Sequence, residues 1–188
     1  MGPIVVVSGL PRSGTSMVMK IVEAGGLELF VDGKRKADED NPKGYFEYER
    51  AKDLAKDNSW LKDVHGKVVK IVSPLLYHLP LAYEYKIIFT KRHMEEILAS
   101  QNKMLERSGR GSHIDDNIMG EKFEEHLKKV YRWIEKQKNI DCLYVSYNEI
   151  IHNPLPTLSK ISEFLEDTLD LNAMTEAIDG SLYRNRIH

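Results

Sequence analysis

The sequence has little of what several classes of protein depend on. A single cysteine, Cys142, excludes an internal disulfide, and its place in a strand-like run indicates a core position rather than a nucleophile. No apolar run approaches the roughly 20 residues that a membrane-spanning helix needs. The start of the chain has neither the basic region nor the cleavage site of a signal peptide. These absences lead us to expect a cytoplasmic protein with no membrane span.

Neither sign of charge dominates the chain. It has 29 Asp and Glu residues and 27 Lys and Arg residues, which gives a formal net charge of −2. Proteins that bind nucleic acids usually carry a marked positive excess, so we expect no nucleic-acid partner. Apolar residues make up 41% of the 188 residues and charged residues 30%. This composition is typical of a globular protein and suits one domain over residues 1–188.

Short apolar runs alternate with helical patterns along the chain. The runs predict buried parallel strands at 3–8, 67–72, 85–90 and 141–146. The helical patterns predict helices at 16–25, 48–57, 93–107, 119–138, 155–166 and 171–178. This alternation predicts an α/β fold, with a three-layer, doubly wound parallel sheet of four to five strands. Ligands of such sheets bind at the carboxyl ends of the strands.

The first strand leads through a glycine loop into a helix. The spacing of Gly9 and Gly14 fits the phosphate-binding motif G-x-x-x-x-G-K-[ST], whose backbone N–H groups surround an anion at a helix start. Thr15 stands where that motif has lysine, and Arg12 inside the loop supplies the cation instead. Its planar fork suits phosphate or sulfate oxygens. The loop therefore predicts an oxyanion site made by Arg12, Ser13, Gly14, Thr15 and Ser16.

Two more strand ends supply candidate ligands. Arg92 follows the strand 85–90, and Ser100 lies about two helical turns further along. An arginine and a hydroxyl so placed suit a second anionic group. Tyr147 follows the strand 141–146 at the same edge of the sheet, where an aromatic ring suits contact with a base.

With these residues in view, the sequence resembles the sulfotransferases that use 3′-phosphoadenosine 5′-phosphosulfate (PAPS). The run 11–16 is similar to their 5′-phosphosulfate loop in its arginine form, and Arg92 with Ser100 matches the pair that binds the donor's 3′-phosphate. The run 143–150 is similar to the family's Tyr-Glu-Asp strand end, which implies that Tyr147 lies near the adenine. Lys70 falls at the lysine of the cytosolic members' Lys-Thr-His motif.

The sequence departs from the cytosolic members at their catalytic histidine. Val72 stands at that position, two residues after Lys70. Other branches of the family use a glutamate base, and Glu47 and Asp32 are both candidates, with Glu47 favoured. His65 and His113 lie in expected loops and are weaker candidates for the same role.

Two further positions differ in the adenine and 3′-phosphate contacts. Met17 stands where cytosolic members have the tryptophan that contacts the adenine, and the C-terminal Arg-Lys-Gly loop is missing. The run 183–186, which contains Arg184, is a loose substitute for that loop as a contact for the 3′-phosphate.

The resemblance implies an enzyme that moves a sulfuryl group from PAPS to a hydroxyl or amine and leaves 3′-phosphoadenosine 5′-phosphate (PAP). It implies no need for a metal, and a small-molecule, carbohydrate or peptide acceptor. The acceptor pocket would come from residues 31–46 and 107–117, or from a second subunit of a homodimer.

Two alternative functions remain at this point. One is a nucleotide-binding module without catalysis, since the base is not identified. The other is a small P-loop kinase or triphosphatase. Thr15 argues against the second, as does the strand end Lys91-Arg92, which lacks the acidic residue that holds Mg²⁺.

Overall fold

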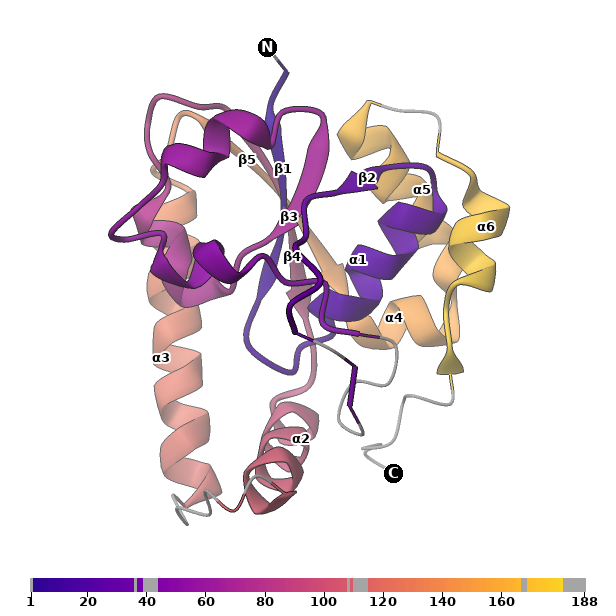
Figure 1. Ribbon diagram of the computed structural model, residues 1–188. Coiled ribbons are helices and arrows are strands. Elements are labelled where there is room, and N and C mark those ends of the chain that lie inside the picture. The colour runs from indigo at the N-terminus through magenta and orange to yellow at the C-terminus, as the bar shows by residue number, and fades with distance from the viewer. Residues whose placement is uncertain are drawn as a thin grey trace.

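The centre of the molecule is a parallel sheet (Figure 1). The computed structural model describes residues 2–35, 37–38, 44–107, 109, 115–166 and 169–180. Five strands lie in the order β2-β3-β1-β4-β5, and each pairs with its neighbours in parallel. Their bounds are β1 Ile4–Gly9, β2 Glu28–Leu29, β3 Lys67–Lys70, β4 Tyr85–Lys91 and β5 Ile140–Ser146. The predicted doubly wound α/β architecture is therefore confirmed.

Helices cover both faces of this sheet (Figure 1). The α-helices are α1 Thr15–Ala24, α2 Met94–Arg107, α3 Asp116–Ile134, α4 Tyr147–His152, α5 Pro154–Leu165 and α6 Leu171–Glu176. Three short 3₁₀ helices also form, η1 Glu49–Asp53, η2 Ser59–Asp63 and η3 Ser73–His78. No helix among the described residues combines the length and the apolar character that a membrane span requires.

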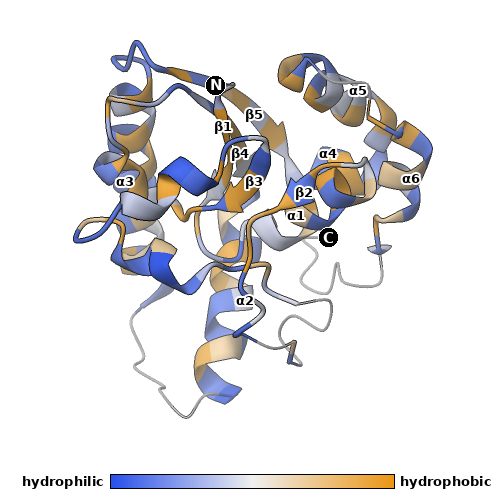
Figure 2. Ribbon diagram, turned by 45° about the horizontal axis from the view of Figure 1, so that its top comes forward, coloured by the Kyte–Doolittle hydropathy of each residue, from blue (hydrophilic) through white to orange (hydrophobic). Residues whose placement is uncertain are grey.

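Alternate residues of each strand face opposite layers. Ile4, Val6, Val69, Ile87 and Phe89 pack toward α3 and the 3₁₀ helices. Their neighbours Val7, Val68, Ile88 and Val145 pack toward α1, α4, α5 and α6. This is the two-residue period of a pleated strand that is buried on both sides. Figure 2 shows the resulting pattern, with hydrophobic strands in the middle and helices that carry both hydrophobic and hydrophilic residues.

Several elements differ from the sequence-based expectation. The helix expected at 48–57 is wrong, because η1 closes with i→i+3 bonds and a turn at Asp57 follows, where the Asp57 carboxylate accepts the N–H of Ser59. Helix α3 begins three residues before 119, because Asp115 caps it by accepting the N–H of Asn117. Elements β2, η2, η3 and α4 were not expected from the sequence. All four are short, and β2 is a two-residue strand that pairs with β3.

Cys142 lies in β5 and packs against the core on the α3 side. Burial raises the pKa of its thiol to about 12. A thiol of this kind stays protonated near neutral pH and is a poor nucleophile, in line with a core position.

Candidate active site

The glycine loop lies between β1 and α1, at the carboxyl edge of the sheet. Gly14 precedes the helix with φ 100°, and no side chain of the described residues caps the first turn of α1. The first N–H groups of the helix therefore face the loop, which is the arrangement that binds anions. Arg12 itself has φ 70°, in the left-handed region. Such a conformation is costly for a residue with a side chain and is typical of functional loops.

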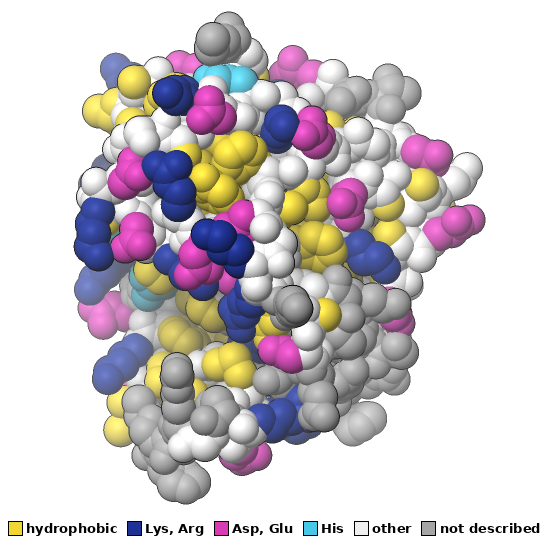
Figure 3. Space-filling model, viewed as in Figure 1, with side chains coloured by type: hydrophobic (Ala, Val, Ile, Leu, Met, Phe, Trp, Pro, Cys, Tyr) yellow, Lys and Arg dark blue, Asp and Glu magenta, His cyan; other side chains and the backbone are white. Residues whose placement is uncertain are grey.

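A cavity of about 580 Å³ opens above this loop. Among the described residues that line it, eight are Lys or Arg and two, Glu47 and Asp179, are acidic. Because the whole chain has a slight negative charge, this concentration of cations is local. Figure 3 shows Lys and Arg side chains near the middle of the face that is turned toward the viewer. The predicted site residues that line the cavity are Arg12, Gly14, Thr15, Ser16, Glu47, Lys70, Arg92, Ser100 and Tyr147.

The two predicted anion-binding arginines lie in one wall of the cavity. Arg12 Nε donates to Ser100 Oγ over 2.9 Å. Arg92 Nη1 donates to the backbone carbonyl of Arg12 over 3.2 Å. The residue pair on β4–α2 therefore lies directly beside the loop on β1–α1, as the parallel neighbours β1 and β4 require. Because both arginines line the same wall, the arrangement is compatible with two oxyanion sites in one cavity.

Tyr147 forms a layer between the loop and Arg92. The Arg92 guanidinium carbon lies 4.3 Å from the centre of the Tyr147 ring. On the loop side, a Cβ placed on Gly14 would lie 2.3 Å from Tyr147 Cδ2, so only glycine fits there. The tyrosine is 4% exposed. Its ring supports the arginine and the loop at once.

Lys70 enters the cavity from the end of β3. Its ammonium donates to the backbone carbonyl of Tyr45 and lies 3.4 Å from both Ser16 Oγ and Glu47 Oε1. Burial lowers the pKa of Lys70 to about 8, although the negative charge of Glu47 acts in the opposite direction. A lysine that loses its proton more readily than an exposed one therefore lies at the start of α1.

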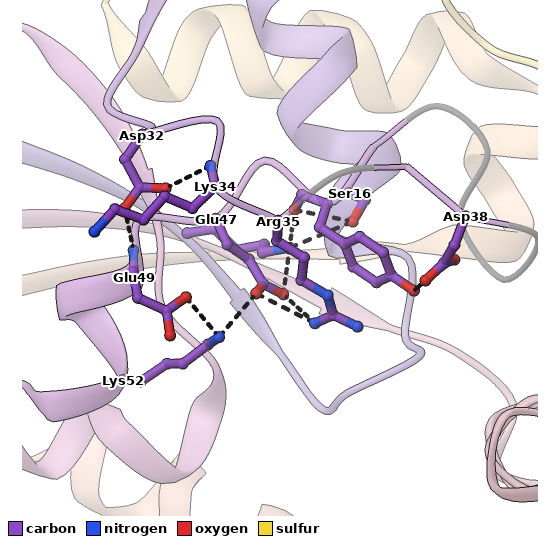
Figure 4. A network of polar contacts seen from close by, with 10 residues as sticks. Ser16, Asp32, Lys34, Arg35, Asp38, Glu47, Glu49 and Lys52 are labelled. Carbon is purple, nitrogen blue, oxygen red and sulfur yellow. Dashed lines mark hydrogen bonds and ion pairs between the residues drawn. The ribbon is translucent and has the colours of Figure 1, made fainter. Parts of the chain in front are cut away.

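Glu47 is surrounded by cations (Figure 4). Arg35 Nη1 binds Glu47 Oε1 over 2.9 Å, and Lys52 Nζ lies 3.7 Å from Glu47 Oε2. Arg35 also stacks on the Tyr45 ring, 3.3 Å from its centre, and the Tyr45 hydroxyl donates to Asp38 over 2.8 Å. Burial and the bond to Asp38 raise the pKa of Tyr45. The carboxylate is thus fixed in the cavity next to Lys70.

The other predicted site residues lie elsewhere. Asp32 does not line the cavity, and its carboxylate accepts the N–H groups of Lys34 and Glu49 (Figure 4). Burial opposes the ionisation of Asp32, but these backbone bonds outweigh it and lower its pKa. Ser13 belongs to the loop but is buried and does not line the cavity, and its hydroxyl has no partner among the described residues. Arg184 and His113 lie outside the described residues. His65 bonds the carbonyl of Gly2, away from the cavity.

Sequence reasoning missed several lining residues. Arg35 lies in the segment 31–46, which we expected to contribute to an acceptor pocket, whereas Lys52 lies outside the expected segments. Both residues contact Glu47. Lys103 and Arg107 follow Ser100 by three and seven residues on α2 and also line the cavity. Arg107 opens the segment 107–117, which we expected to contribute to the pocket, and helical spacing after Ser100 could have revealed Lys103.

Comparisons with known proteins agree with this fold. Solved structures of similar fold include the sulfotransferase domain of a Synechococcus olefin synthase, at 16% identity and TM-score 0.56, with 97% of this chain and 79% of that chain covered. A mouse sulfotransferase complexed with PAP matches at 14% identity and TM-score 0.57, over 95% of this chain and 63% of that one. A retinol dehydratase in complex with retinol and PAP matches at 16% identity and TM-score 0.54, over 98% of this chain and 67% of that one.

At these identities the structural matches concern the fold. No curated protein sequence matches the chain. A family model described as the sulfotransferase domain matches residues 3–185. With nearly the whole chain matched, the protein belongs to the sulfotransferase family of transferases.

Proposed function

We propose that this sulfotransferase moves a sulfuryl group from PAPS to a hydroxyl or amine acceptor. The observation that carries this proposal is the common wall of Arg12 and Arg92, beside the start of α1, which no side chain in the described part of the chain caps. Two anionic groups of one nucleotide fit such a wall, because each meets its own arginine. The excess of cations in the cavity suits a donor with several negative charges, and the volume of about 580 Å³ is in the range of ligand pockets.

Each end of the donor has its own residues in this proposal. Arg12, the backbone of residues 13–16 and Lys70 would bind the 5′-phosphosulfate. Arg92 and Ser100 would bind the 3′-phosphate, with Arg184 as a further contact. Tyr147, buried between Gly14 and Arg92, would form the inner wall of the nucleotide site near the adenine. Residues 1–188 would act as one domain.

The bound donor supplies a sulfuryl group on an anionic leaving group. Glu47 would take the proton of the acceptor O–H or N–H as the new bond to sulfur forms. As the old sulfur–oxygen bond breaks, its electron pair passes to the 5′-phosphate oxygen, where Arg12, Lys70 and loop N–H groups would stabilise the charge. Lys70 lies 3.4 Å from Ser16 Oγ, in the loop that would bind the 5′-phosphosulfate, and 3.4 Å from Oε1 of Glu47, the proposed base. It is therefore next to both groups.

A binding experiment tests the donor. We expect PAP to bind at micromolar concentration or tighter in calorimetry, and clearly better than adenosine 5′-phosphate. Arg92→Ala should weaken PAP by about 10- to 100-fold, since a hydrogen bond to a charged group contributes about 1.5–3 kcal/mol. The affinity for adenosine 5′-phosphate should change little.

Lys91→Ala is the matched control for this experiment. Lys91 is the preceding residue, but its ammonium lies over the Tyr131 and Tyr144 rings, and it does not line the cavity. Both affinities should stay as in the parent protein. Equal losses for the two nucleotides in Arg92→Ala would contradict the assignment of Arg92.

The base is tested by Glu47→Gln. We expect transfer from labelled PAPS to the best acceptor in a panel of phenols, sugars and amines to fall by about 10²- to 10⁴-fold. The dissociation constant of PAP should stay within about threefold, because Arg12, Arg92 and Ser100 are unchanged. Glu49→Gln is the control, as Glu49 pairs with Lys52 but does not line the cavity.

The same experiment separates the alternative function. A nucleotide-binding module without catalysis would bind PAP but transfer no label to any acceptor, in the parent protein as in the variant. Normal transfer by Glu47→Gln would instead exclude Glu47 as the base.

A further inference from the structure

A buried carboxylate on α2 binds the guanidinium of Arg92. Glu96 lies one helical turn after Arg92 and is 1% exposed. Arg92 Nε donates to Glu96 Oε2 over 2.7 Å, and the arginine side chain is itself only 7% exposed. A carboxylate so far from water is costly unless it is paired, so this ion pair is a fixed part of the fold.

The second oxygen of Glu96 is also bound. Asn148 Nδ2 donates to Glu96 Oε1 over 3.0 Å. Asn148 belongs to α4 and follows Tyr147, whose ring lies against the Arg92 guanidinium. Asn148 therefore connects the carboxylate to the same helix that supports the face of the arginine.

The orientation of Arg92 is set from three sides. Glu96 binds its Nε, the Tyr147 ring covers one face of the guanidinium, and the Arg12 carbonyl accepts from Nη1. These contacts come from α2, α4 and the glycine loop. A guanidinium fixed in this way loses little freedom when it binds an oxyanion, which favours binding.

We propose that Glu96, supported by Asn148, is a positioning residue that sets the preference of this protein for 3′-phosphorylated nucleotides. It acts through Arg92 and does not touch the nucleotide. The inference rests on the proposed function, because it takes Arg92 as the ligand of the 3′-phosphate. The ratio of the affinities for PAP and adenosine 5′-phosphate tests this role, since a purely structural role would weaken the binding of all nucleotides alike.

The test compares PAP with adenosine 5′-phosphate on the full chain by calorimetry. Glu96→Ala should reduce the preference for PAP about tenfold or more, with little change for adenosine 5′-phosphate. Glu96→Gln should retain most of the preference, because its amide oxygen still accepts from Arg92 Nε. Glu95→Gln is the control, as this neighbour is exposed and does not line the cavity.

The outcomes distinguish the donor assignment from the positioning role of Glu96. If the parent protein binds both nucleotides equally, the donor assignment fails. If it prefers PAP and Glu96→Ala keeps that preference, the positioning role is overturned. Should Glu96→Ala not fold, Asn148→Ala decides in its place. Loss of its amide should reduce the preference about threefold, and an unchanged ratio would overturn the role.

Discussion

Replacing Lys70 by methionine is expected to slow sulfuryl transfer about a hundredfold or more and to make the ligand-free protein more stable. The Lys70 side chain is 5% exposed, and burial lowers the pKa of its ammonium from 10.5 to about 8. The folded state thus binds this proton more weakly than the unfolded chain does. Stability is therefore lost as the pH falls from about 10.5 to about 8, and the loss is complete below that range. At pH 7 it amounts to about 3 kcal/mol.

Part of this gain is offset in the variant. Methionine leaves the Tyr45 carbonyl without the ammonium, and it removes one of three cations from Glu47, which keeps Arg35 and Lys52. We therefore expect a net increase of about 1–2 kcal/mol in the free energy of unfolding at pH 7. Denaturant unfolding at pH 7 and pH 10 measures it, and the increase should shrink at the higher pH.

Lys67→Met is the matched control on the same strand. Lys67 pairs with Glu28 at the surface, so its loss should change the stability by less than about 1 kcal/mol. A Lys70→Met variant that is less stable than the parent at pH 7 would contradict the account of the buried ammonium.

The pH dependence of the rate should follow the same group. If charged Lys70 stabilises the leaving oxygen, kcat/KM falls as the pH rises through about 8, where the free enzyme loses this proton. Lys70→Arg should move this decrease to higher pH, because an arginine stays charged. A parent profile that is flat through pH 9 would exclude the role.

Gly14→Ala is expected to disrupt both proposed oxyanion sites at once. Gly14 has φ 100°, and its added Cβ would lie 2.3 Å from Tyr147 Cδ2. The ring cannot retreat without moving the Arg92 guanidinium that lies 4.3 Å from its centre. We expect a loss of about 2–4 kcal/mol of stability from strain and overpacking together. The affinity for PAP should fall more than tenfold.

Gly26→Ala separates strain from contact. Gly26 has φ 111°, close to the value at Gly14, but nothing lies within 4 Å of its added Cβ. This control should lose only the strain, about 1–2 kcal/mol, and bind PAP normally. Equal losses of stability and normal PAP binding in both variants would show that the Tyr147 ring does not depend on Gly14. Thermal unfolding and calorimetry provide the two measurements.

The sequence reveals the fold because its signals are local. Apolar runs of four to seven residues predict β1, β3, β4 and β5 to within a few residues, and Gly25-Gly26 marks the end of α1. The short helix α4 and the 3₁₀ helices η2 and η3 have no such signal. Their hydrogen bonds are few, so packing on the sheet decides them.

In the candidate site, too, some residues could be predicted from local sequence signals and others could not. The sequence places Arg12, Arg92 and Ser100 together, because the ends of parallel neighbours meet at one edge. The partners of Glu47 could not be predicted, since they depend on the path of the segment before η1. Glu96 and Asn148 are 52 residues apart and meet only in the folded chain. Asp32 had suitable chemistry, but its bonds to backbone N–H groups depend on the turn around it.

Both tryptophans of the chain lie on one side of the sheet. Trp60 is buried in the core that faces α3, and Trp133 packs against that same core. Neither lines the cavity. Intrinsic tryptophan fluorescence therefore samples the layer of α3 and the 3₁₀ helices and carries no direct signal from α1, α5 and α6. Emission and far-ultraviolet circular dichroism, followed together during unfolding, would separate the melting of the two layers.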